Sequence, residues 1–109
     1  MKTADVWEVM LDQLERAREQ FMRYKSARYS KKNREKWTLG LGKVQGLCNL
    51  IIASSNRIPH TWKLRMIKRL EEMRKKPLYT SDGDWYRCRI AIDKAIRHLT
   101  TVTHSEDTL

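Results

Sequence analysis

Turn-forming residues, cysteine and long apolar runs are all scarce in this sequence of 109 residues. Only four Gly and two Pro are present, which favours few connections and long helices. The longest apolar stretch is GLCNLIIA, less than half of the ~20 residues that a membrane-spanning helix needs. The N-terminal MKTADVWEVM also lacks the apolar run of a signal peptide. We therefore expect a cytoplasmic protein that does not enter a membrane.

The two cysteines, Cys48 and Cys88, each lie within an apolar pattern of helical spacing. Such a setting predicts buried free thiols in a reducing compartment. A disulfide that joins two helices is the alternative.

No sequence motif indicates catalysis, a metal or a cofactor. GLGKV resembles the end of a phosphate-binding loop, but the first required Gly is missing and Val44 occupies the position of the Ser or Thr. The three His residues share no ligand spacing with either Cys, so we predict no metal site. A helix–turn–helix over residues 49–70 would lack the glycine of its tight turn. We therefore predict a protein that is not an enzyme, with no catalytic residue and no cofactor.

Each of the four Trp residues begins an apolar pattern with helical spacing. The clearest pattern starts at Trp85 and continues through Cys88, Ile92 and Leu99, all on one helix face. The four patterns predict helices near residues 3–28, 33–54, 59–76 and 82–102. We expect the Trp side chains to be core or end-cap residues.

Short polar connections separate the predicted helices, and no segment alternates as a half-buried strand does. Pro59 suits the first turn of the third helix, and Pro77 ends that helix. Short loops between amphipathic helices favour antiparallel neighbours. We therefore predict an all-α fold, a compact four-helix bundle with antiparallel up-down topology. Residues 1–102 would form the single domain, and the polar residues 103–109 a flexible tail.

The second predicted helix contains three glycines, Gly40, Gly42 and Gly46, each ~1 kcal/mol less favourable there than Ala. Gly42 and Gly46 are four residues apart and share a helix face. They predict either close packing against a neighbouring helix or self-association of the chain into a homo-oligomer. A break in the helix at LGLG is the alternative.

The net charge of +10 is concentrated in two segments. Residues 23–36 carry seven basic side chains and one acidic, and residues 57–76 carry eight basic and two acidic. In an up-down bundle the first and third connections lie at the same end. We therefore predict one basic end, continued along the outer face of the third helix.

This basic end is the candidate binding site. Arginine's planar fork suits phosphate or carboxylate, and a Tyr ring can stack on a base. The predicted nucleic-acid or anion-binding residues are Arg23, Lys25, Arg28, Tyr29, Lys31, Lys32, Arg34, Lys36, Arg74, Lys75 and Lys76.

These features predict a small binding module that holds DNA or RNA through phosphate contacts. The alternative partner is an acidic protein surface. Small basic helical chains without motifs are frequent among accessory proteins of phages and mobile elements. Such a protein would inhibit a host defence or nucleic-acid-processing protein, or would sequester a small anionic nucleotide between chains.

Overall fold

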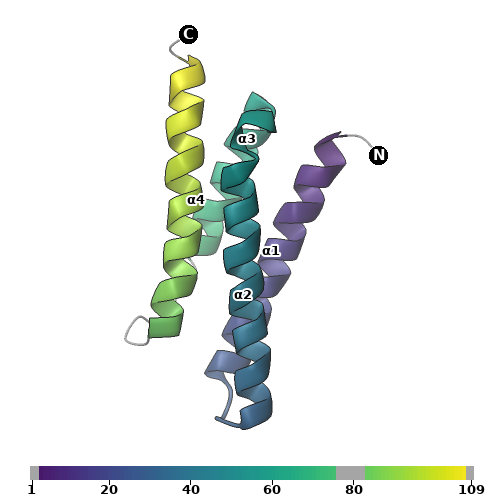
Figure 1. Cartoon of the computed structure of the whole chain (residues 1–109), viewed down its shortest axis with the longest axis vertical. Coiled ribbons are helices and arrows are strands. Elements are labelled where there is room, and N and C mark those ends of the chain that lie inside the picture. Colours follow the sequence, from purple (N-terminus) through teal and green to yellow (C-terminus); the bar gives the residue numbers. More distant parts are fainter. Residues whose placement is uncertain (1–2, 76–82, 108–109) are drawn as a thin grey trace.

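Four α-helices make up the computed structural model, which describes residues 3–75 and 83–107. They are α1 (Thr3–Ser26), α2 (Lys31–Ala53), α3 (His60–Lys75) and α4 (Gly83–Asp107), with a 3-10 turn, η1 (Ser55–Arg57), between α2 and α3. The helices pack side by side into an elongated bundle (Figure 1). The predicted all-α four-helix bundle is confirmed.

In the part of the chain that the structure describes, helices that follow one another pack together, except that α2 packs on α4 and not on α3. α1 packs on α2 and α3 packs on α4, but over the described residues α2 lies against α4 and makes little contact with α3. Trp37 contacts Asp84 near the start of both α2 and α4, and Ser55 just after α2 contacts His98 late in α4. These two helices therefore run in the same direction, and two helical hairpins meet along them (Figure 1).

The apolar stripes of the four helices meet in one core. Side chains with no exposed surface include Leu11, Leu14, Phe21, Val44, Ile51, Met66, Leu70, Ile92 and Leu99. Trp7, Trp37 and Trp85 are buried, and Trp62 is half-buried against the core, as predicted for the Trp residues. Cys48 and Cys88 are also buried free thiols, as predicted.

Gly40 is the glycine at which α1 and α2 come close together. A Cβ atom there would lie 2.8 Å from the backbone nitrogen of Phe21 and 3.0 Å from the carbonyl oxygen of Ala17. At Gly42 and Gly46 a Cβ atom would have no described atom within 4 Å apart from the adjoining residues of α2 itself. The prediction that Gly42 and Gly46 pack against a neighbouring helix of the chain is therefore wrong, because they lie on the outward side of α2. Their use in self-association stays a prediction.

The helix boundaries differ from the predicted ones mainly at the C-terminus. α2 continues through all three of its glycines without a break. α4 runs to Asp107, so the predicted tail 103–109 is helical as far as that residue. Thr103 is buried there, and Glu106 bonds to α3. These tertiary contacts hold a segment whose sequence alone favours fraying.

Two charged side chains, Arg18 and Lys63, are each only 1% exposed. Burial lowers the pKa of Arg18, and its long apolar stem fills part of the core. Lys63 donates a hydrogen bond to Glu106, whose other carboxylate oxygen lies 2.9 Å from His60 Nδ1. The bonds from Lys63 and His60 hold the pKa of Glu106 below its usual value. This cluster ties the start of α3 to the end of α4.

Candidate nucleic-acid interface

The turn between α1 and α2 carries most of the predicted binding residues, and local hydrogen bonds fix its shape. Ser30 caps α2 by accepting a hydrogen bond from the backbone N–H of Asn33 at 3.0 Å. The side-chain amide of Asn33 donates to the carbonyl oxygen of Arg28 at 2.9 Å. The turn is therefore held by its own side chains and presents its neighbours in fixed positions.

Lys25 and Lys36 serve the packing of the helices. Lys25 Nζ lies 4.4 Å from the ring centroid of Trp37 and 4.0 Å from Asp84 Oδ2, which also accepts from Trp37 Nε1 at 3.3 Å. Lys36 Nζ lies 4.7 Å from the ring centroid of Tyr24. Both ammonium groups are attracted to an aromatic face. These two predicted binding residues are therefore half-buried structural contacts at the junction of α1, α2 and α4.

The other basic side chains of this segment point to solvent. We call this group the basic corner. It consists of Arg23, Arg28, Lys31, Lys32 and Arg34, all of which are exposed. Tyr29 lies beside them with 68% of its surface exposed, and its ring centroid is 6.1 Å from that of Trp37.

The electrostatics of the two helix ends at this turn differ. Arg23 stands in the last turn of α1, where a cation is favoured by the negative end of the helix dipole. The first turn of α2, described throughout, contains Lys31, Lys32 and Arg34 but no acidic residue. Three cations at the positive end of a dipole oppose local stability. Helix stability explains Arg23, but it does not explain the three cations of α2.

The structure does not bring Arg74 to the basic corner. Arg74 lies 3.6 Å from Asp93 of α4. Asp84, the residue of α4 that contacts Trp37 near the start of α2, is about 14 Å from Asp93 along the helix axis. Figure 1 shows α3 ending well above the α1–α2 turn, because α3 has 16 residues and α1 has 24. Lys75 ends α3, and its side chain and all of Lys76 lie outside the described residues. The predicted single basic end therefore does not include Arg74.

The predicted basic face of α3 is also interrupted by ion pairs with neighbouring helices. Lys63 is buried against Glu106. Arg69 donates to Asp12 at 3.1 Å and to Glu15 at 2.7 Å, both on α1. These contacts bind α3 to the rest of the bundle, and they neutralise charge that was predicted to lie on the outer surface.

Other chemically active groups have structural partners. Ser55 Oγ lies 2.9 Å from His98 Nε2, and because Ser55 is buried this pair fastens η1 to α4. Among the residues that the structure describes, no three His, Cys, Asp or Glu side chains come together in a way that could hold a metal ion. Within the same ranges, no helix combines the length and the apolar character needed to cross a membrane.

Searches of protein-family models, of curated proteins and of solved structures found no match to this chain. Function is therefore inferred from the chain's own residues.

Proposed function

We propose that the protein is a non-enzymatic module that binds nucleic acid by placing the basic corner against phosphates. Three of its five exposed cations, Lys31, Lys32 and Arg34, stand in the first turn of α2, where backbone N–H groups and the helix dipole also favour an anion. Arginine forks and lysine ammonium groups bind phosphate without reading bases. The chemistry therefore favours binding with little sequence preference.

One observation carries this proposal: Lys31, Lys32 and Arg34 occupy the first turn of α2 without an acidic neighbour in that turn. Acidic residues there would each stabilise a helix by about 0.3–1 kcal/mol, and cations have the opposite effect. A bound phosphate would remove this repulsion. The arrangement is thus unfavourable for the isolated chain and favourable for a complex with a polyanion.

Tyr29 adds a second kind of contact. Its exposed ring sits at the edge of the basic corner, where an unpaired base can stack on it. Such stacking contributes about 1–3 kcal/mol per base, and the bases of a duplex are not available for it. We therefore expect Tyr29→Ala to weaken binding of a single strand and to leave duplex binding almost unchanged.

The test is fluorescence anisotropy with a labelled duplex and a labelled single strand at about 50 and about 200 mM salt. The wild type is compared with the triple variant Arg28→Ala, Lys31→Ala and Lys32→Ala. The matched control is Lys68→Ala, Lys94→Ala and Arg97→Ala, which removes the same charge from exposed positions on α3 and α4.

We expect wild type and control to bind duplex with an affinity that falls as salt rises. In the basic-corner variant the negative slope of log K against log salt should become shallower by about 2–3, since each phosphate contact contributes about −0.9. Equal losses in variant and control would show that only net charge matters. Absence of binding in both salts would refute the proposal and turn attention to an acidic protein partner.

A further inference from the structure

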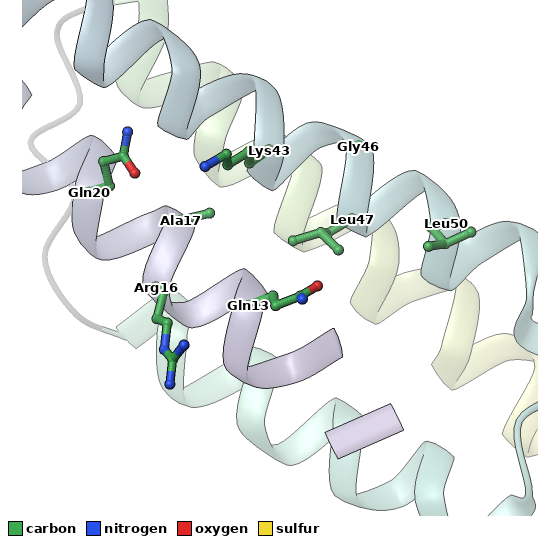
Figure 2. A pocket seen from close by; sticks show the side chains of 8 residues that line it. All are labelled: Gln13, Arg16, Ala17, Gln20, Lys43, Gly46, Leu47 and Leu50. Atoms are coloured by element: carbon green, nitrogen blue, oxygen red, sulfur yellow. The ribbon is translucent and has the colours of Figure 1, made fainter. Parts of the chain in front are cut away.

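Three adjoining hollows lie on the outer face of the α1–α2 hairpin, and we call them together the α1–α2 groove. The first, of about 540 Å³, lies between α1 and α2 (Figure 2). It shares Lys43 with the second hollow, and Arg16 and Gln20 with the third. The second and third both include Leu39. The hollows therefore form one continuous surface.

The floor of this groove is apolar, although it faces solvent. Leu39 is 55% exposed and Leu50 is 49% exposed, on the side of α2 opposite the core. Between α1 and α2, Ala17 and Leu47 point into the hollow (Figure 2). Removing exposed leucine surface from water is favourable, so this surface is stabilised when a partner covers it.

The shape of α2 fits close approach by another helix. Gly42 and Gly46 lie between the two exposed leucines, and apart from the adjoining residues of α2 no described atom stands within 4 Å of where their Cβ atoms would be. Leu39 and Leu50 are about 16 Å apart along the helix axis, or three turns. A docked helix of three or more turns would cover both leucines and lie close to the backbone at the glycines.

The positive charge around the groove favours an acidic partner over a second copy of the chain. The described residues that line the three hollows include six basic and two acidic side chains. The basic ones are Arg16, Arg23, Lys31, Arg34, Lys36 and Lys43, and the acidic ones are Glu19 and Glu35. A second copy would bring the same positive rim, and like charges across an interface disfavour binding. A nucleic-acid backbone has no apolar surface to place on the leucines.

We propose that the α1–α2 groove binds a helix of a partner protein that is apolar along one face and acidic on its flanks. Apolar side chains at positions i, i+3 or i+4 and i+7 of that helix would cover Leu39, Leu47 and Leu50. Its carboxylates would meet the basic rim. The groove shares Arg23, Lys31 and Arg34 with the basic corner, whereas Leu39, Leu47 and Leu50 belong to the groove alone and allow a separate test.

The probe is a labelled helical peptide of five turns with Leu at three- and four-residue spacing and Glu on both flanks. A second peptide carries Lys in place of Glu. Binding is measured to the wild type, to the double variant Leu39→Gln and Leu50→Gln, and to a control double variant. The control is Leu64→Gln and Tyr86→Gln, which changes two exposed apolar residues outside the groove.

We expect the Glu peptide to bind the wild type and the control at least tenfold more tightly than the Lys peptide, and the groove variant to lose at least tenfold. Equal binding of the two peptides, or equal losses in both variants, would overturn the proposal. Sedimentation provides a further test: a wild-type dimer that becomes a monomer in the groove variant would identify a second copy as the occupant. Nucleic-acid affinity should be unchanged in the groove variant, and a loss there would assign the groove to the nucleic-acid interface instead.

Discussion

Gly40 is the position at which one added methyl group tests the packing of α1 on α2. In Gly40→Ala the new Cβ would lie 2.8 Å from the backbone nitrogen of Phe21 and 3.2 Å from its Cα atom. Backbone atoms cannot turn away as the end of a flexible side chain does. α1 would have to move outward, which would loosen the contact between Phe21 and Trp85, whose ring centroids are 5.1 Å apart.

Two opposing effects set the size of the change. Ala in place of Gly inside a helix stabilises the folded state by about 1 kcal/mol. Overpacking a contact that cannot relax costs about 2–3 kcal/mol. The cost of the clash should exceed the gain in helix propensity. The free energy of unfolding should therefore fall by about 1–2 kcal/mol, and Tm by about 5–15 °C.

The assay is thermal and urea unfolding followed by circular dichroism. Gly42→Ala and Gly46→Ala are matched controls in the same helix, and both should gain about 0.5–1 kcal/mol because a methyl group there meets no described atom. A Gly40→Ala protein as stable as these controls would refute the packing of α1 against α2 at this residue.

Two further predictions concern ionisable groups. Hydrogen bonds from Lys63 and His60 lower the pKa of Glu106 from its usual 4.5, so their stabilisation is present above pH 4.5 and is lost as pH falls through the lowered pKa. Glu106→Gln should therefore be less stable than wild type at neutral pH in urea titrations, and a difference that did not shrink on acidification would contradict this. Burial raises the pKa of Cys48 to about 12 and that of Cys88 to about 11. At about pH 8 a thiol reagent should label Cys48 about a thousandfold more slowly in the folded protein than in denaturant, and rapid labelling of the native protein would contradict the burial.

Helical periodicity predicted the elements and most of the core, and it also indicated two charged residues on the core-facing side of their helices. Lys63 stands three residues before Met66, and Arg18 stands four after Leu14, so both share the apolar face of their helix. Their charge suggested exposure, and the structure buries both. A long side chain can line the core when its charged end finds a partner, as Lys63 finds Glu106.

The α1–α2 turn was also open to prediction from sequence, because its Ser cap and dense positive charge are local features. The contribution of α3 was not. Whether Arg69 and Arg74 form ion pairs depends on acidic residues of α1 and α4 that are distant in sequence. Similarly, helical spacing showed that Gly42 and Gly46 share a face, but it did not show which face of α2 meets α1.

The sequence by itself determined that this chain is helical, that it has four amphipathic segments and that positive charge is dense around residues 23–36. These properties arise from contacts within a few residues, where spacing and composition act directly. Only the tertiary structure decided that α2 lies along α4, that Gly40 is the close contact and that Leu39 and Leu50 stay exposed. Each of these depends on which helix faces cover one another, and that choice is made by the summed packing of the whole core.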